Sequence, residues 1–338
     1  MYNLKLALVT VLILLVSTFS FAQGEIAITK VKITDNVTLY KTGETGVFTN
    51  MIAVSTTNGV VVFDAHLLPS VAKKIRTMIE SDFGKKIVYL INTHGWYDHT
   101  NGNMIFRDIP IIGHDKAKTE MERWKDPARF ATTTTRQLEG TIKAKESYKG
   151  IAKEMEEQIL SLQKLSEDLK ADFQHTPPTI SFNDKMTLTV GKTTFQMIYN
   201  LPTYSESDII INIPEENVLI IGDIFNKSRL PWFSPNTNFN AWKELFKNFI
   251  ADNSKIKSFI GTHGYPMDIN EVKEQFMFID KLREEVANLK KAGKTLDEVK
   301  KEVKLSKFPY LSNVNPLFYG TPINMLDIAI NVVYDQAK

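Results

Sequence analysis

The sequence predicts an α/β fold in a single domain. Short β-type runs, a helical pattern and a continuous apolar run follow one another, and this alternation is typical of α/β proteins. Of the 338 residues, 43% are hydrophobic, which is ordinary for a globular protein and enough for a sizeable core. No linker rich in Gly, Ser or Pro divides the chain. We therefore expect residues 23–338 to form one domain.

The first part of this domain predicts short strands separated by turn residues. The segment Thr57-Asn58-Gly59 is typical of a hairpin turn. Residues 69–81 predict a helix, because apolar residues recur there three or four positions apart on one face. The continuous apolar run Ile87–Ile91 is typical of a strand buried on both faces. The strands expected in this part are 31–33, 37–39, 51–55, 60–63 and 87–91.

Residues 115–173 are long, charged and almost without strand signals, so we expect a helical insert there. Apolar residues from Ile151 to Leu169 repeat at intervals of three or four, which predicts an amphipathic helix of several turns. One interpretation is a helix packed on the main body with Lys and Glu facing solvent. The other is a lid or dimer arm over a site, and the sequence leaves both open.

Strands are expected again after Pro177-Pro178, and residues 269–338 predict a helical extension at the carboxyl end. The expected strands are 186–190, 194–199, 209–213 and 218–221, and the expected helices are 269–291, 295–303 and 323–336.

Residues 1–22 predict a secretory signal peptide. Lys5 precedes an apolar stretch, Leu6 to Val16, and Ser20-Phe21-Ala22 supplies small residues before a cleavage point. This stretch is shorter than the roughly 20 apolar residues of a membrane span. We therefore expect a periplasmic or secreted protein with no stable membrane anchor after cleavage.

Charge and cysteine content exclude several function classes. The 41 basic residues nearly balance 39 acidic ones, so no basic surface predicts nucleic acid as a partner. The absence of cysteine excludes disulfides, thiolate nucleophiles and iron–sulfur clusters. Any metal must be bound by the six histidines and by carboxylates.

A group of polar residues follows the expected strand Ile87–Ile91. His94, Asp98 and His99 lie within six positions of one another at its carboxyl end. Imidazole and carboxylate together suit a divalent ion such as zinc. The alternative is a polar turn whose hydrogen bonds are satisfied within the protein.

The segment Thr93-His94-Gly95-Trp96-Tyr97-Asp98-His99 resembles the signature Thr-His-x-His-x-Asp-His of the metallo-β-lactamase superfamily. Three further segments resemble this family in the same order: the hairpin strand that ends at Asp64, the strand that ends at Asp223, and the loop Ile260 to Pro266. The resemblance covers roughly residues 28–115 and 176–270. It implies a four-layer αβ/βα metallo-β-lactamase-like sandwich with a helical insert and a helical carboxyl-terminal extension.

The resemblance also implies metal ligands. The family has two neighbouring metal sites, and Asp98, His99 and His263 match the terminal ligands of the second, with Asp223 as the carboxylate that bridges both. Two histidine positions of the first site are occupied here by Trp96 and Tyr204, so that site retains only His94. A single imidazole does not hold zinc tightly. We therefore expect one metal ion in the second site, zinc in the first instance, with iron or manganese as alternatives.

Other residues receive roles with open alternatives. Asp64 is expected to support the ligand loop through hydrogen bonds. His94 is expected to act as a base or proton shuttle, with a pKa near neutrality, or else to pack against Trp96. Tyr204 is expected to donate a hydrogen bond to an oxyanion, or else to be satisfied by Asp98 or Asp208.

Two sets of residues remain. Trp96 is expected to fill the volume of the missing site and to line the substrate site. Trp232 and Phe233 belong to an aromatic loop that forms either an apolar wall for substrate or ordinary packing. The histidines outside the motif are expected to have structural or surface roles: His66, His114 and His175.

The resemblance implies an exported hydrolase for a small-molecule substrate. Asp98, His94 and Tyr204 are its expected catalytic residues, and a metal-bound hydroxide would attack the carbonyl of an ester, lactone, thioester or lactam. The alternative is a non-catalytic ligand-binding protein on the same scaffold, suggested by Trp96 and Tyr204 at ligand positions. Nothing in the sequence indicates the oligomeric state.

Overall fold

The computed structural model describes residues 25–337 apart from 148–151, 228, 252–254, 312–313, 315–316, 319 and 322. The expected signal peptide, residues 1–22, lies outside the described residues. Among the helices of the described part, none combines the length and the apolar character that a membrane span requires.

In the described part, the first sheet has seven strands in the order β1 to β7. The strands from β1 to β4 pair antiparallel, and those from β4 to β7 pair parallel. Thr57 and Asn58 form the turn between β3 and β4, and Gly59, the first residue of β4, follows with a φ of 121°. Helix α1 (Pro69–Phe83) connects β4 to the parallel β5 and ends at Gly84 in a left-handed conformation. The strands are β1 (Ile28–Lys32), β2 (Val37–Thr42), β3 (Met51–Thr56), β4 (Gly59–Phe63), β5 (Ile87–Ile91), β6 (Ile111–His114) and β7 (Ile180–Phe182).

Within the same described ranges, the second sheet has five strands in the order β12-β11-β10-β9-β8. The pairs from β8 to β11 are antiparallel, whereas β11 and β12 are parallel. The strands are β8 (Lys185–Val190), β9 (Thr193–Tyr199), β10 (Ile209–Ile213), β11 (Val218–Gly222) and β12 (Ser258–Gly261).

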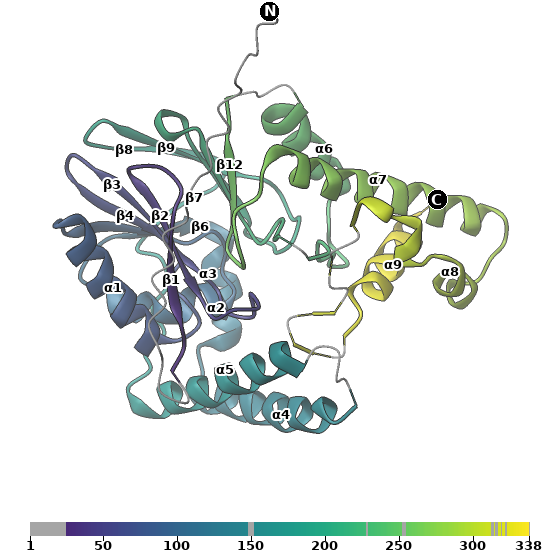
Figure 1. Cartoon of the computed structure of the whole chain (residues 1–338), viewed down its shortest axis with the longest axis horizontal. Coiled ribbons are helices and arrows are strands. Elements are labelled where there is room, and N and C mark those ends of the chain that lie inside the picture. The colour runs from purple at the N-terminus through teal and green to yellow at the C-terminus, as the bar shows by residue number, and fades with distance from the viewer. Residues whose placement is uncertain are drawn as a thin grey trace, which may run out of the picture.

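The two sheets pack face to face and carry helices on their outer faces (Figure 1). The inner faces share one buried cluster, in which Phe63 and Ile91 of the first sheet meet Phe195 and Ile220 of the second. The rings of Phe63 and Phe195 are 5.9 Å apart. Separate clusters join α1 to the first sheet and the carboxyl-terminal helices to the second. This arrangement of helix, sheet, sheet and helix confirms the predicted fold class.

The insert consists of helices, as predicted: α3 (Asp115–Met121), α4 (Pro127–Lys145) and α5 (Ala152–Ala171). Helices α4 and α5 run side by side along one edge of the molecule (Figure 1). Leu165 and Leu169 of α5 are buried in the cluster that contains α1. This packing favours the interpretation of α5 as a helix laid on the main body.

Helices α6 (Phe239–Phe246), α7 (Ile269–Lys291), α8 (Leu296–Glu302) and α9 (Met325–Gln336) cover the second sheet. Asp268 and Glu271 form a capping box that begins α7, and Thr295 and Glu298 form the equivalent at α8. Short single-turn helices are η1 (Asn101–Phe106), η2 (Glu122–Trp124), η4 (Pro214–Glu216), η5 (Lys247–Ala251), η6 (Leu305–Lys307) and η7 (Pro309–Leu311).

The bounds of β5, β10 and α7 agree with the prediction to the residue. Strand β1 begins three residues before the predicted start and ends one residue before the predicted end. Strands β6 and β7 were not predicted. They have four and three residues, which is too short for a periodic pattern, and prolines precede both.

Candidate metal centre

The residues of the predicted second site come together at the carboxyl ends of strands from both sheets. Asp98 and His99 lie on the short helix α2 (Tyr97–Thr100), which begins six residues after the end of β5. Asp223 directly follows β11, and His263 lies two residues after β12. We call these four residues the ligand group. Each sheet contributes two of them, so the group lies at the junction of the two halves of the fold.

The spacing of the ligand atoms suits one metal ion. His99 Nε2 lies 3.3 Å from Asp98 Oδ2 and 3.3 Å from Asp223 Oδ2. His263 Nε2 lies 3.4 Å and 3.5 Å from the same two oxygens. A tetrahedral zinc ion with bonds of about 2.0–2.1 Å has ligand atoms about 3.3–3.4 Å apart. All four ligand atoms lie within 4.8 Å of one another, so they can surround a single ion.

Burial supports the same conclusion. The side chains of His99 and Asp223 have no exposed surface, and only Asp98, at 20%, is partly exposed. Within the described ranges, His99 Nε2, Asp98 Oδ1 and Asp223 Oδ2 are buried and make no hydrogen bond. Buried polar atoms normally have partners, because leaving them unsatisfied costs free energy. A divalent cation would satisfy His99 Nε2 and Asp223 Oδ2, so the donor set fits a metal. Asp98 Oδ2, the oxygen spaced for the ion, accepts a hydrogen bond from the Thr49 hydroxyl at 3.3 Å.

Asp64 fixes the orientation of His99. Its carboxylate accepts a hydrogen bond from His99 Nδ1 at 2.9 Å, and others from the backbone N–H and the hydroxyl of Thr93, both at 2.8 Å. Asp64 follows β4 with a φ of 54°, a left-handed conformation that Asp tolerates better than most residues. With the proton on Nδ1, His99 presents Nε2 to the ligand group, as metal-bound histidines require.

The other members of the ligand group are held in similar ways. His263 Nδ1 donates to the backbone carbonyl of Gly46 at 3.0 Å. Asp223 accepts hydrogen bonds at Oδ1 from Asn226 and from the hydroxyl of Thr262. Because Oδ1 accepts these hydrogen bonds, Oδ2 of Asp223 is the oxygen that faces His99 and His263 and could bind a metal ion.

Charge coupling perturbs the pKa of every member of the ligand group. Burial alone would lower the pKa of His99, but Asp98, Asp223 and Asp64 raise it well above the usual value. The pKa of His263 likewise rises to about 9, against burial, beside Asp223 and Asp98. Burial would raise the pKa of Asp98 and Asp223, but the two imidazoles hold both low. Without metal, the group is therefore a charged network, and a cation entering it displaces protons.

Aromatic rings occupy the position of the predicted first site. The Trp96 ring lies 4.9 Å from that of Tyr204, and the His94 ring lies 5.5 Å from Tyr204 and 4.1 Å from His99. We call His94, Trp96 and Tyr204 the aromatic half. Two of its members, Trp96 and Tyr204, stand at positions where the resemblance expects imidazole ligands of the first site, which needs three ligands.

His94 is a neutral imidazole. Burial, followed by the neighbouring His99, lowers its pKa to about 4, so the expectation of a pKa near neutrality is wrong. Its Nδ1 lies 3.1 Å from the hydroxyl of Thr93, and Nε2 has no hydrogen-bond partner among the residues that the structure describes. A group with so low a pKa is a poor proton acceptor at neutral pH but can still make a hydrogen bond.

The loop that carries Tyr204 is organised by Asp208. The Asp208 carboxylate accepts hydrogen bonds from the backbone N–H groups of Thr203, Tyr204 and Ser205, at 3.2, 2.6 and 2.8 Å. Burial raises the pKa of Asp208 to about 7. The hydrogen bond from Tyr204 to Asp208 is made by the tyrosine backbone, so the predicted partner of the Tyr204 hydroxyl stays a prediction.

Glu120 was missed in the sequence. It lies on α3, is buried, and accepts hydrogen bonds from the backbone of Gly95 at 3.3 Å, the backbone of Glu206 at 2.8 Å and the hydroxyl of Ser207. It thereby joins the loop of Trp96 to the loop of Tyr204. No sequence signal marks it, because a glutamate in a charged helical segment normally faces solvent.

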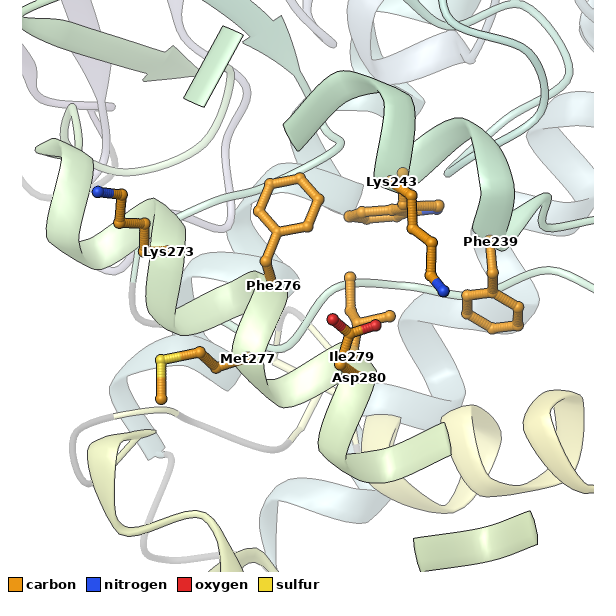
Figure 2. Close-up of a pocket in the computed structure, with 8 residues that line it drawn as sticks. Phe239, Lys243, Lys273, Phe276, Met277, Ile279 and Asp280 are labelled. Carbon is orange, nitrogen blue, oxygen red and sulfur yellow. The ribbon is translucent and has the colours of Figure 1, made fainter. Parts of the chain in front are cut away.

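The predicted aromatic wall belongs to the helical layer. Phe233 is buried and packs edge-on against Phe239 and Trp242, and Trp232 packs against Phe318. For Phe233 the structure therefore favours ordinary packing, the second of the two interpretations. A cavity of about 480 Å³ lies nearby between α6 and α7 (Figure 2), and neither Phe233 nor the ligand group lines it.

The three remaining histidines have structural surroundings. His66 is buried, accepts a hydrogen bond from the Leu68 backbone and lies 3.1 Å from the Thr42 hydroxyl. His114 caps α3 by accepting from the Lys116 backbone. His175 lies 3.9 Å from Glu122.

The fold is an αβ/βα sandwich with four residues at the junction of its sheets that could hold a metal ion. The family model of the metallo-beta-lactamase superfamily matches residues 45–262. The chain belongs to this superfamily, as the sequence motif predicts. A search of curated proteins finds no match.

Solved structures share the fold at low identity. The sec-alkylsulfatase Pisa1 from Pseudomonas sp. is 16% identical with a TM-score of 0.66, over 91% of this chain and 50% of the sulfatase. The metallo-beta-lactamase from Pontibacter korlensis is 13% identical with a TM-score of 0.50, over 73% and 96% of the two chains. The DIM-1 metallo-beta-lactamase is 14% identical with a TM-score of 0.50, over 74% and 96%. The present chain thus spans about half the length of the sulfatase.

Proposed function

We propose that the protein is an exported, metal-dependent hydrolase that works with one metal ion. Its substrate is a small molecule whose carbonyl carbon is attacked by water: an ester, lactone, thioester or lactam. The observation that carries this proposal is that two buried ligand atoms, His99 Nε2 and Asp223 Oδ2, have no hydrogen-bond partner and are spaced with the other two ligand atoms for one tetrahedral ion. Membership of a superfamily of hydrolases supports it.

Asp98, His99, His263 and Asp223 would hold the ion. Nitrogen and oxygen ligands suit zinc, with iron or manganese as alternatives. When bound, such an ion lowers the pKa of a water molecule toward 7 and polarises a carbonyl.

The chain's own residues supply the rest of the chemistry. Asp98 is the member of the ligand group with the most exposed side chain, at 20%, so its carboxylate is placed to accept a hydrogen bond from an attacking water and orient it. His94, neutral and buried, orients that water through a hydrogen bond. Tyr204 donates a hydrogen bond to the oxyanion that develops on the carbonyl oxygen.

One ion, not two, follows from the aromatic half. Trp96 and Tyr204 stand where two imidazoles would be required, and their rings pack against each other. His94 alone supplies too few ligands for a second tight site.

Export is part of the proposal. Its support is the amino-terminal sequence, with an apolar stretch after Lys5 and small residues before position 23. Intact-mass measurement of the protein from a periplasmic or culture fraction tests it, with a mature chain that begins at Gln23 as the expected result.

The central experiment is a metal count on residues 23–338, combined with a substrate panel. We expect one zinc, iron or manganese ion per chain by mass spectrometry and turnover of at least one ester, thioester, lactone or lactam. His99→Ala should lose both, whereas the control His175→Ala should keep both, because His175 lies outside the ligand group. A wild-type protein without stoichiometric metal would contradict the proposal.

A second candidate is a non-catalytic ligand-binding protein on the same scaffold. Replacement of two metal-ligand positions by Trp96 and Tyr204 favours it. It predicts retained ligand binding without turnover of any panel compound. The panel should also include a secondary alkyl sulfate, the substrate class named for the Pseudomonas enzyme.

A further inference from the structure

The orientation of His263 depends on a loop far from it in sequence. Its Nδ1 atom donates to the carbonyl of Gly46, which lies in the connection between β2 and β3. Gly46 has a φ of 85°, and a Cβ atom there would lie 3.4 Å from the backbone nitrogen of Gly264. The loop therefore approaches the His263 segment closely, and the position of its backbone sets the direction of the His263 ring.

This loop is held from outside by helix α5. The Glu157 carboxylate accepts hydrogen bonds from the backbone N–H of Glu44, the backbone N–H of Thr45 at 3.0 Å and the hydroxyl of Thr45. Gly43 permits the approach, since a Cβ atom there would lie 3.0 Å from a Glu157 oxygen. One side chain of the insert thus satisfies three donors directly before Gly46.

Two buried cations hold the same loop from inside. Lys41 donates to the carbonyls of Gly43 and Glu44, at 2.6 and 3.2 Å. Arg229 donates to the carbonyl of Thr45 at 3.1 Å and pairs with Glu154 of α5 at 3.2 Å. Lys41 and Arg229 donate hydrogen bonds to the loop carbonyls, and Glu157 accepts hydrogen bonds from the loop N–H groups. Together these contacts fix the conformation of the loop backbone.

We propose that Glu157 is a positioning residue for the metal centre, acting through the 43–46 loop on His263. This inference rests on the proposed metal-binding function. It gives the insert a defined role, because α5 braces a loop whose carbonyl fixes one ligand. Loss of a partner that orients a metal ligand typically weakens metal binding about 10–100-fold. Because Glu157 acts through one intervening loop, we expect an effect of about tenfold, at the lower end of that range.

The test compares three variants of the chain 23–338 by competition between zinc and a chelator. Glu157→Gln removes the charge, and Glu157→Asp keeps the charge but shortens the reach by one methylene. The matched control is Glu156→Gln, which removes the same charge from a neighbouring exposed position that contacts Lys145 and not the loop. We expect both Glu157 variants to bind zinc about tenfold more weakly than the wild type and the control to be unchanged. Equal losses in Glu156→Gln and Glu157→Gln would identify a charge effect and overturn the proposal.

A second readout works without metal. The His263 Nδ1–H proton should exchange slowly with solvent in the wild type because it is bonded to Gly46, and faster in both Glu157 variants. If the wild type binds no zinc, the proposed function fails, yet this exchange measurement still decides the role of Glu157. Unchanged exchange in both Glu157 variants would overturn that role, and thermal unfolding of each variant verifies that it is folded.

Discussion

The ligand group and the aromatic half lie side by side but are held by different kinds of contact. In the ligand group, each imidazole donates a directed hydrogen bond that fixes its ring, His99 to Asp64 and His263 to the carbonyl of Gly46. In the aromatic half, the side chains pack ring against ring, as between Trp96 and Tyr204, while hydrogen bonds to Asp208 and Glu120 hold the backbone of their loops. The hydrogen bonds at Nδ1 direct each Nε2 atom toward the centre, whereas ring packing buries apolar surface and offers no ligand atom. Under the proposed function, this difference suits the ligand group to bind an ion and the aromatic half to exclude one.

Removal of a member of the ligand group should have the largest effect. Asp223→Ala deletes a buried carboxylate that faces both His99 and His263. We expect zinc affinity to fall by more than about a hundredfold, beyond the loss typical of an orienting partner. Chelator competition measures it, with the exposed Asp172→Ala as control. Retained tight binding would show that Asp223 is not a ligand.

Placing imidazoles in the aromatic half should allow it to bind a second metal ion. The double variant Trp96→His, Tyr204→His, together with His94, supplies the three nitrogen ligands that a zinc site requires. We expect a metal count of two ions per chain, the second bound more weakly. Trp96→His alone supplies two imidazoles and should remain at one ion. A double variant that still binds one ion would mean that the backbone of this half, and not its side chains, excludes the second.

Weakening an orienting bond should have an intermediate effect. Asp64→Asn places an amide where the carboxylate now accepts three hydrogen bonds, so one donor faces another. Zinc affinity should fall about 10–100-fold. The free energy of unfolding should fall by about 1–3 kcal/mol, the cost of an unsatisfied buried group. Calorimetry of metal-free and loaded protein separates the two effects, and unchanged affinity would exclude an orienting role.

The smallest effect on the metal centre is expected at His66, a buried imidazole outside both halves. Burial lowers its pKa to about 3, below the value near 6.5 in an unfolded chain. Between these two pKa values, His66 is protonated in the unfolded chain but neutral in the folded chain. The free energy of unfolding therefore falls as the pH drops below about 6.5. Between pH 7 and pH 5 this contributes about 2 kcal/mol. His66→Asn suits the φ of 71° and does not titrate, so urea unfolding should show a shallower pH dependence; parallel curves would contradict this.

The sequence predicts the fold well where apolar periodicity is long. Strand β10 and helix α7 match to the residue because an apolar run and a repeat over 23 residues define them. Strands β6 and β7 were not predicted because a segment of three or four residues is too short to show a periodic pattern. They become strands because β6 pairs parallel with β5 and β7 pairs parallel with β6, which is a tertiary effect.

The candidate centre is predictable only in part. The motif identifies Asp98 and His99 because both lie within one short segment, and the resemblance adds Asp223 and His263. Glu120 and Glu157 could not be found, since a glutamate in a charged helix predicts a solvated face. Their partners are backbone N–H groups of distant loops, and no side-chain pattern in the sequence records such contacts.

The origin of the ligand group in two sheets has a consequence for unfolding. Asp98 and His99 belong to the first half of the chain, and Asp223 and His263 to the second. An ion bound to all four is a reversible cross-link between segments more than a hundred residues apart. Since a ligand that binds only the native state adds to its stability, chelation should lower the melting temperature. It should also loosen the coupling between the sheets, so that metal-loaded protein unfolds as one unit and stripped protein in a broader transition.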